Sequence, residues 1–521
     1  MNYKTLLTAF ALTLCTTFAG AQSKLSIDNV VKAYIQNSGA IYQDGHIKGY
    51  FLFCQTDKID RHTNAYSLNI MDQNLNKVKE IKFDDDKKVE LLEAAYNGNA
   101  LLFLFNDREN KSLQARIYDM DGNLKFTYSR PLDKRSEAFI QEYVNFTAKN
   151  DEATNQKVFS ISDKGFGVVI PLKDGRDETY ELDYYSSDTK AQYTYIPPTD
   201  GRFAKAIFLG ATDSLMVVQV GRKEHAMSGQ YTSSIVGVNF VTKKKEFELN
   251  DGMDMYKFVP QYCTHLNNSG NLLLMGSYYD KTANIIKDFS LGLAIYTISP
   301  SGQIVSSTYN SWSKDIGKYL AMNEKGKIDD IGFLFFHNIV QTQDGRLFAI
   351  GEGYKRVADG VGIAMNALSA VGGYYHAGGN TELKVTDMVI LKFNPDFTIA
   401  GASIQHKNPN VFHTDYADFN SQHELALIMK QWGYFDYAFT TTDPVTGSFA
   451  ICYNDYERSK DYHGMTFHSL RYDGTKFNGD KIELKSKASN QRVLPGQPGY
   501  VMIYEYFRKD KRIDLRLEKL N

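Results

Sequence analysis

The stretch Ala115-Arg-Ile-Tyr-Asp-Met-Asp-Gly-Asn-Leu-Lys-Phe126 decides the fold class. Both of its ends are rich in residues that favour β-strands, and its polar middle, Asp119-Met-Asp-Gly-Asn123, contains glycine. This order of strand, turn and strand predicts a β-hairpin. Leu293-Ala-Ile-Tyr-Thr-Ile-Ser-Pro-Ser-Gly-Gln-Ile304 repeats the pattern. Because each hairpin follows a separate apolar strand, the pattern is typical of a β-propeller blade.

The apolar strand with its hairpin recurs about eight times, and most starts lie roughly 50 to 60 residues apart. The apolar strands are Gly49–Cys54, Ala100–Phe105, Gly165–Ile170, Leu215–Val220, Asn271–Met275, Leu347–Ile350, Phe449–Cys452 and Tyr500–Tyr504. Ala426–Met429 and Tyr437–Phe439, within residues 419–442, could be strands of a further partial blade. The sequence therefore predicts an all-β protein, a propeller of six to eight four-stranded blades, with seven or eight favoured.

Burial explains why the repeat is needed. One small twisted sheet cannot bury both faces, whereas neighbouring blades packed face to face can. The last repeat lacks an outer strand, and the segment Leu25–Tyr42 can supply one. We therefore expect an N-terminal strand to complete the last blade and close the ring, which also removes an exposed sheet edge.

Two segments depart from the repeat. Leu132–Ala153 is charged and compatible with a surface helix between blades. Arg356–Asp387 is rich in alanine and glycine and interrupts the sixth repeat between two strands. Long insertions in compact folds often carry function. The expected organisation is a signal peptide over residues 1–21 and a single propeller domain over residues 22–521, with an insert at about 356–387.

The first 21 residues have the pattern of a secretory signal peptide. Lys4 precedes the apolar run Leu6–Phe18, and Ala19-Gly-Ala21 forms a small-x-small cleavage site. We expect an exported protein, in the periplasm or outside the cell, without a transmembrane segment after cleavage. Removal of Lys4 leaves 58 basic against 61 acidic residues, a net charge of −3. That balance argues against nucleic acid as a partner.

Three cysteines remain after the leader: Cys54, Cys263 and Cys452. Two of them lie in or beside apolar strands, so buried free thiols are the favoured interpretation. One disulfide with one thiol left over is the alternative.

No strong catalytic motif is present. The chain has no Gly-x-Ser-x-Gly, no phosphate-binding Gly-x-x-x-x-Gly-Lys, and no complete His-Glu-x-x-His. Asp119-Met-Asp-Gly-Asn123 begins like a calcium loop, but Arg130 stands where an acidic ligand is required. A hairpin turn explains this segment better.

Two groups of residues are candidates for a site. His406, His413, Asp415, Asp418 and His423 lie within eighteen positions and offer ligands suited to a divalent metal. In the insert, Tyr374 and Tyr375 could stack on a sugar or peptide, and His376 could serve the same pocket. Polar propeller loops and a self-packed insert are the competing explanations. No cofactor is predicted, and a divalent metal is the alternative.

With this repeat, the chain resembles exported propeller-like proteins of bacteria that have no characterised function. The resemblance covers nearly the whole mature chain but brings no functional residues. The expected fold, the absence of a catalytic motif and the Ala/Gly-rich insert together favour a non-catalytic binding or scaffold propeller of the cell envelope. We expect a monomer whose partner is an envelope protein or a glycan. A secreted carbohydrate-active hydrolase or lyase, with its site at the channel mouth, is the alternative. A purely structural envelope component is a third interpretation.

Overall fold

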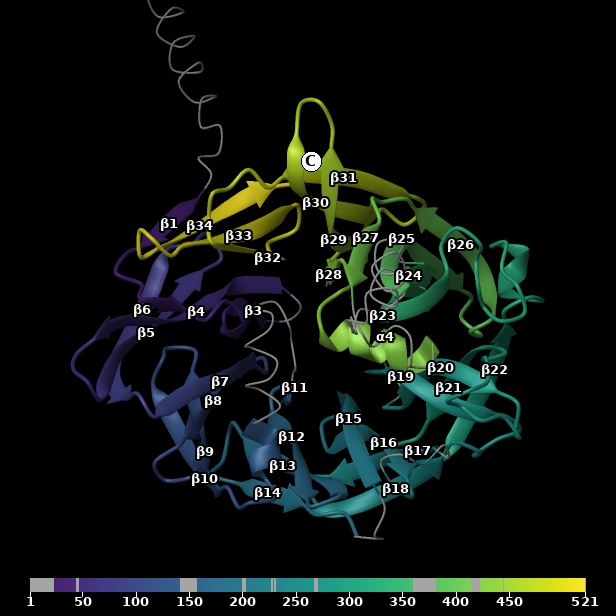
Figure 1. Ribbon diagram of the computed structural model, residues 1–521, viewed down its shortest axis with the longest axis horizontal. Coiled ribbons are helices and arrows are strands. Elements are labelled where there is room, and N and C mark those ends of the chain that lie inside the picture. The colour runs from purple at the N-terminus through teal and green to yellow at the C-terminus, as the bar shows by residue number, and fades with distance from the viewer. Residues whose placement is uncertain are drawn as a thin grey trace, which may run out of the picture. The chain divides into compact units, whose positions relative to one another are not determined.

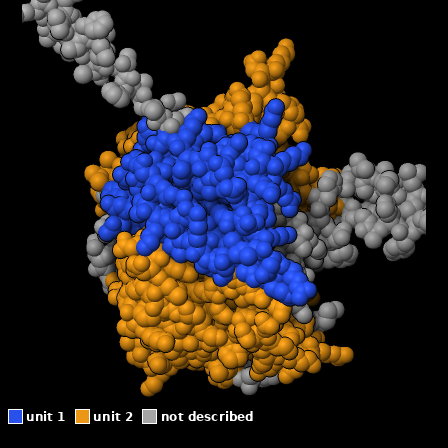
Figure 2. Space-filling model, turned by 90° about the vertical axis from the view of Figure 1, so that its left-hand side faces the viewer, with its two compact units in different colours: residues 1–84, 486–521 blue, residues 85–485 orange. Residues whose placement is uncertain are grey.

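The computed structural model describes residues 23–43, 46–140, 157–198, 203–225, 228, 231–266, 270–358, 381–413, 422–443 and 445–520. Within these ranges the chain forms eight sheets, each with a path of four antiparallel strands. The chain is an eight-bladed β-propeller, which confirms the predicted fold class. It divides into two compact units, residues 1–84 with 486–521 and residues 85–485, coloured separately in Figure 2.

Unit 2 holds six consecutive blades, each a meander in chain order. Blade 2 is β7 Val89–Tyr96, β8 Ala100–Asp107, β9 Ser112–Asp119 and β10 Leu124–Pro131. Blade 3 is β11 Val158–Ile161, β12 Gly165–Asp174, β13 Asp177–Ser186 and β14 Gln192–Tyr195. Blade 4 is β15 Phe203–Ala211, β16 Leu215–Lys223, β17 Thr232–Asn239 and β18 Lys244–Asn250. Blade 5 is β19 Lys257–His265, β20 Leu272–Tyr279, β21 Gly292–Ile298 and β22 Ile304–Ser311, and it is followed by the 3₁₀ turn η2 Ile316–Lys318. Blade 6 is β23 Phe333–Gln341, β24 Leu347–Ala358, β25 Thr381–Phe393, β26 Ile399–Gln405 and β27 Asn410–His413. Helix α4 Gln422–Gln431 precedes blade 7, which is β28 Tyr437–Thr442, β29 Phe449–Arg458, β30 His463–Tyr472 and β31 Phe477–Glu483.

Unit 1 contains two blades built from the two ends of the chain. Blade 1 is β2 Lys32–Ala33, η1 Ile35–Asn37, β3 Gly39–Gln43, β4 His46–Lys58, β5 Thr63–Asp72 and β6 Lys77–Asp86; blade 8 is β32 Asn490–Pro495, β33 Tyr500–Phe507, β34 Arg512–Lys519 and β1 Lys24–Ile27. Strand β1 pairs with β34 over all four of its residues. The prediction that an N-terminal strand completes the last blade is therefore confirmed.

One five-residue turn joins the third and fourth strands of blades 1, 2, 5 and 6. The turns are residues 72–76, 119–123, 299–303 and 394–398. In each, the first amide bonds to the fifth carbonyl and the fourth amide bonds to the first carbonyl. The fourth residue has φ between 65° and 83°, a conformation that favours glycine. The repeated pattern around Asp119 and Ser299 is thus a backbone requirement, and Asp119 caps its own turn by accepting from the Asn123 amide at 2.7 Å.

The hydrophobic core lies between successive blades. In unit 2, separate buried clusters join blades 2 and 3, 3 and 4, 4 and 5, 5 and 6, and 6 and 7. The first strands of blades 2 to 6 also contact one another in succession, as Figure 1 shows for unit 2. Each apolar strand found in the sequence is the second strand of its blade, where both faces pack against neighbours.

The prediction of a further partial blade within residues 419–442 is wrong. Ala426–Met429 belongs to helix α4, and Tyr437–Phe439 begins the first strand of blade 7, so the partial extra blade is wrong. A short apolar run fits a strand or a buried helix equally well. In contrast, the three cysteines are buried and free, as predicted. Residues 137–140 are helical, within the expected surface helix, while residues 141–156 lie outside the described part of the chain.

Candidate functional site

Blade 6 departs from the plain meander. Strands β24 and β25 remain paired out to Ala358 and Thr381, well past the end of β26. The short strand β27 pairs with the extended part of β25. Helix α4 packs on the same extension through Leu425, Ala426 and Met429, and Figure 1 shows it beside β23. We call the extended β24–β25 ends, β27 and α4 the blade 6 platform.

A group of buried charges lies where the platform meets blade 7. Lys407 lies in the loop after β26. Its Nζ is 3.3 Å from Oε1 of Glu352 on β24 and forms an ion pair with Oδ2 of Asp436. The side chains of Lys407 and Glu352 are completely buried, and that of Asp436 is 11% exposed. Three further bonds complete the network: Asn410 Nδ2 donates to Asp436 Oδ1 at 3.0 Å, and the amides of Asp436 and Tyr437 donate to Glu352 at 3.3 and 2.9 Å.

Aromatic rings enclose this network. His337 on β23 stacks on Tyr437 with ring centroids 4.8 Å apart and meets Phe435 edge to face at the same distance. Its Nε2 lies 3.2 Å from Glu352 Oε2. Burial lowers the pKa of His337, aided by the charges of Lys430 and Lys407 and opposed by Glu352. The imidazole is therefore neutral at physiological pH.

The acids of the network have opposite pKa shifts. Burial alone would raise the pKa of Glu352, but the His337 hydrogen bond and the Lys407 charge outweigh it and hold that pKa below its usual value. Burial, together with the Glu352 charge, raises the pKa of Asp436 to about 6 despite Lys407. Burial would lower the pKa of Lys407, yet the two carboxylates raise it. Lys407 offsets one of the two negative charges, and the amides of Asn410, Asp436 and Tyr437 bond to the carboxylate oxygens.

The same loop is held by acids on both sides of Lys407. Asp387 on β25 accepts the Lys407 amide at 3.2 Å and lies 2.9 Å from Nδ1 of His406. Asp455 on β29 accepts the Asn408 amide at 3.1 Å. The tripeptide 406–408 is thus anchored by side chains of blades 6 and 7. His406 itself is 83% exposed, with one ring nitrogen fixed by the Asp387 carboxylate.

Half-buried aromatic rings form a row on the platform. Phe412 on β27 stacks on Tyr434 with centroids 4.3 Å apart and planes 16° apart. Trp432, just after α4, also stacks on Tyr434, with centroids 6.5 Å and planes 28° apart. We call these three residues the aromatic row. Phe412 belongs to the platform, and Trp432 and Tyr434 directly follow its helix α4. Asp387, the partner of His406, is on β25.

The predicted site residues fall mostly outside the described residues. Tyr374, Tyr375 and His376 lie in the undescribed segment 359–380, and Asp415 and Asp418 lie in 414–421. His413 is on β27 and His423 is in α4, but their side chains are not described. Among described side chains, no group of three His, Cys, Asp or Glu is arranged to hold a metal. Of the predicted cluster, His406 alone has a described partner, Asp387.

Sequence reasoning missed Glu352, Lys407 and Asp436. One signal was available: Glu352 stands between two glycines in the otherwise apolar run Leu347-Phe-Ala-Ile-Gly-Glu-Gly-Tyr354. An acid inside a buried strand requires a partner, because an unpaired buried charge is very costly. The identity of that partner, 55 positions later at Lys407, depends on the fold.

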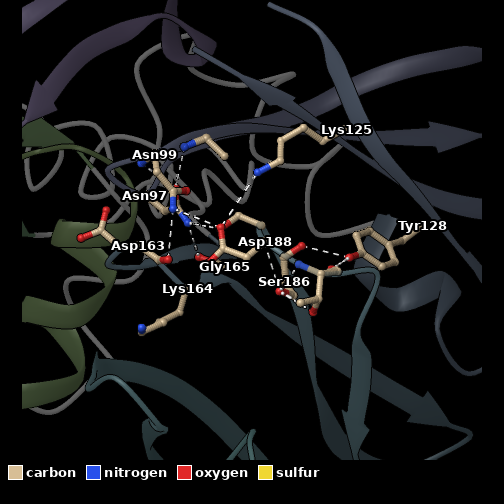
Figure 3. Close-up of polar contacts among 12 residues, drawn as sticks. Asn97, Asn99, Lys125, Tyr128, Asp163, Lys164, Gly165, Ser186 and Asp188 are labelled. Atoms are coloured by element: carbon tan, nitrogen blue, oxygen red, sulfur yellow. Dashed lines mark hydrogen bonds and ion pairs between the residues drawn. The ribbon is translucent and has the colours of Figure 1, made fainter. Parts of the chain in front are cut away.

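A second polar cluster joins blades 2 and 3. The Asn97 amide donates to Ser187 Oγ at 3.0 Å and to the Gly165 carbonyl at 3.3 Å, while Asn99 donates to the Asp163 carbonyl at 3.1 Å. Figure 3 shows these side chains reaching from one blade to the other. Because Asn97 is 3% exposed and all these bonds are internal, the cluster fastens two blades together.

None of the described helices is long and apolar enough to cross a membrane. Among solved structures, the chain is similar to an ACO/RPE65 chimera (9% identity, 57% of this chain and 64% of that chain, TM-score 0.28). It is also similar to prolyl oligopeptidase B from Galerina marginata (8% identity, 97% and 59%, TM-score 0.38), and to an oligogalacturonate lyase in complex with manganese (8% identity, 92% and 99%, TM-score 0.36). The chain spans less than two thirds of the ACO/RPE65 chimera. Likenesses this distant carry no argument about activity.

No curated protein sequence is significantly similar to this chain. One family profile matches residues 1–521, and it describes a family of unknown function. Because the match covers the whole sequence, the chain belongs to that family, DUF6770.

Proposed function

We propose that this protein is an exported, non-catalytic binding propeller that holds a glycan on the blade 6 platform. The observation that carries the proposal is the platform itself. Blade 6 extends its two central strands, adds a fifth strand and a helix, and anchors them with buried charges. A rigid, elaborated base for a long insert supports a role in recognition, because binding residues commonly lie on loops held by a rigid scaffold.

The aromatic row indicates the ligand class. Three half-buried rings lie nearly parallel, at 16° and 28° to one another. The faces of such rings carry partial negative charge, and the C–H bonds on the face of a sugar ring are complementary to it. The leader-like residues 1–21 support export to the periplasm or the cell exterior, where envelope glycans are found.

The charge network supports binding rather than turnover. Glu352, Lys407 and Asp436 are buried and bond to one another, so they are committed to holding the structure. A catalytic acid or base must instead reach the substrate within hydrogen-bonding distance.

Glycan titration calorimetry with the mature chain, residues 22–521, tests the proposal. Replacing Trp432 or Tyr434 with alanine should weaken binding by about 0.5–1.5 kcal/mol each, roughly 2- to 12-fold. Tyr319→Ala is the matched control, since Tyr319 is an exposed aromatic residue outside the platform. Unchanged affinity in both row variants, or no binding across a panel of envelope glycans, would contradict the proposal.

The rival function is a hydrolase or lyase acting on carbohydrate, and one observation favours it. An exposed imidazole with Nδ1 fixed by Asp387, as in His406, is arranged like a general base. If the protein degrades the glycan that it binds, His406→Ala should abolish turnover while leaving affinity unchanged. Under the binding proposal, the parent protein leaves the glycan intact.

A further inference from the structure

A lysine and an aspartate lie side by side in the buried network, with a glutamate against the lysine. Nζ of Lys407 contacts Oδ2 of Asp436 and lies 3.3 Å from Oε1 of Glu352. The amides of residues 436 and 437 bond to Glu352, and Asn410 bonds to the other oxygen of Asp436. The three reactive groups are thereby fixed relative to one another.

Little solvent reaches these groups. The side chains of Lys407 and Glu352 have no exposed surface and that of Asp436 is 11% exposed. His337 lies 3.2 Å from Glu352 and contacts the rings of Tyr437 and Phe435. In a site of low polarity, an ammonium beside a carboxylate differs from an amine beside a carboxylic acid by the position of one proton. The ion pair is the resting arrangement, because the two carboxylates raise the pKa of Lys407. Transfer of one proton from Nζ to Asp436, whose pKa burial raises to about 6, gives the neutral amine and the neutral acid that can react.

We propose that Lys407 and Asp436 become joined by an intramolecular amide bond. Nζ of the neutral amine attacks Cγ of the neutral acid, a C–N bond forms, and the bond from Cγ to the leaving oxygen breaks. One water molecule is released, and no oxidant or energy source is required. The product is an amide across two loops of the protein.

Two neighbours have defined roles in this step. Glu352 accepts a proton from Nζ and delivers it to the leaving hydroxyl, and so ends as the carboxylate it was at the start. Asn410 Nδ2 lies 3.0 Å from Asp436 Oδ1, the oxygen that carries negative charge in the tetrahedral intermediate. A donor placed there stabilises that charge.

Ten other lysine–carboxylate pairs of the described residues lack this environment. In each of these ten the lysine side chain is at least 30% exposed. In water both groups stay ionised, and the amine has no free electron pair with which to attack. The burial of Lys407 therefore singles out this pair.

The bond would join the two ends of the segment that contributes β27 and α4 to the platform. Residues 407 and 436 are 29 positions apart, and the chain between them contains β27 and α4. An amide at this point closes a covalent loop that contains both elements and keeps the two ends of that segment joined while the bond is intact.

Mass spectrometry of the denatured full chain tests the proposal. The parent should be lighter than its sequence by the mass of one water molecule. Digestion should yield one branched peptide that contains Lys407 and Asp436, with no cleavage after Lys407. A parent chain of full mass, or a bond to any residue other than Asp436, would overturn the proposal whatever the variants do.

Variants separate chemistry from folding. Glu352→Gln keeps the lysine, the aspartate and the side-chain size, and should give a chain of full mass. Lys407→Met and Asp436→Ala should do the same, and Lys481→Met, which alters an exposed pair, should retain the bond. Complete bond formation in Glu352→Gln would refute the assigned role of Glu352.

Discussion

A buried ion pair between blades 2 and 3 gives a sharp stability prediction. Asp183 on β13 is fully buried and receives Arg130 from β10 at 2.5 Å, the Tyr185 hydroxyl at 3.0 Å and the Thr194 hydroxyl at 2.7 Å. Arg130 also pairs with Glu181. Asp183→Ala removes the acceptor for all three donors and leaves the guanidinium, 12% exposed, with one carboxylate.

The magnitude follows from these contacts. Breaking a buried ion pair by removing one partner costs about 3–5 kcal/mol. The buried Tyr185 hydroxyl left without an acceptor adds about 1 kcal/mol. Glu181 remains beside Arg130 and offsets part of the loss, so we expect about 4 kcal/mol, close to a thousandfold change in the opening equilibrium.

Hydrogen exchange is the appropriate assay, because a multi-blade protein need not unfold in one step. Amides of β12 and β13 should lose roughly a thousandfold protection, given an opening free energy reduced by about 4 kcal/mol. Glu178→Ala is the control: its lysine partners are more than half exposed, and such pairs contribute about 1 kcal/mol or less. The double variant Arg130→Met/Asp183→Leu should recover much of the loss. If Asp183→Ala and Glu178→Ala lose equal protection, the reasoning fails.

Three further predictions follow from burial and backbone geometry. Burial places the pKa of His337 below its unfolded value, so its stabilising contribution is complete above about pH 6.5 and is lost as the pH falls; by NMR its titration midpoint should lie below that of a free histidine, and a midpoint at or above the free value would contradict this. Burial raises the pKa of Cys54, Cys263 and Cys452 to about 12, so a thiol reagent should label none of them until denaturant is added; labelling in the native state would contradict this. Gly302→Ala should destabilise blade 5 by about 1–3 kcal/mol, because φ is +83° and the new Cβ would lie 2.4 Å from Cβ of Phe247; a melting temperature equal to that of the parent would refute it.

The fold was predictable because its signal is local. The second strand of each blade packs on both faces, and such strands appear in the sequence as apolar runs like Leu215–Val220. The turns repeat because their backbone requires a left-handed fourth residue, as at Gly122 and Gly302. The one misassigned element, Ala426–Met429, is apolar for a different reason: it is the face of a helix that packs on blade 6.

The site was not predictable to the same degree, because its residues are distant in the sequence. His337, Glu352, Lys407 and Asp436 span a hundred positions and come from two strands of blade 6 and two loops. His406 attracted attention as one of several nearby histidines, yet its described partner is Asp387, which the sequence reasoning placed at the edge of the insert. Proximity in the sequence was the wrong guide, because propeller strands return to the same end of the molecule after long intervals.

The buried charges of this network need an explanation beyond stability. A cluster with two carboxylates, one ammonium and a neutral imidazole is costly to bury unless every group has a partner. Here two of the partners come from the segment that follows β26, Lys407 in the loop and Asn410 on β27. Replacing the network with apolar side chains could hold the platform equally well, so stability alone does not account for charges at this point. An amide between Lys407 and Asp436 does: it requires an amine, an acid and a proton carrier together, and it removes two of the buried charges once it forms.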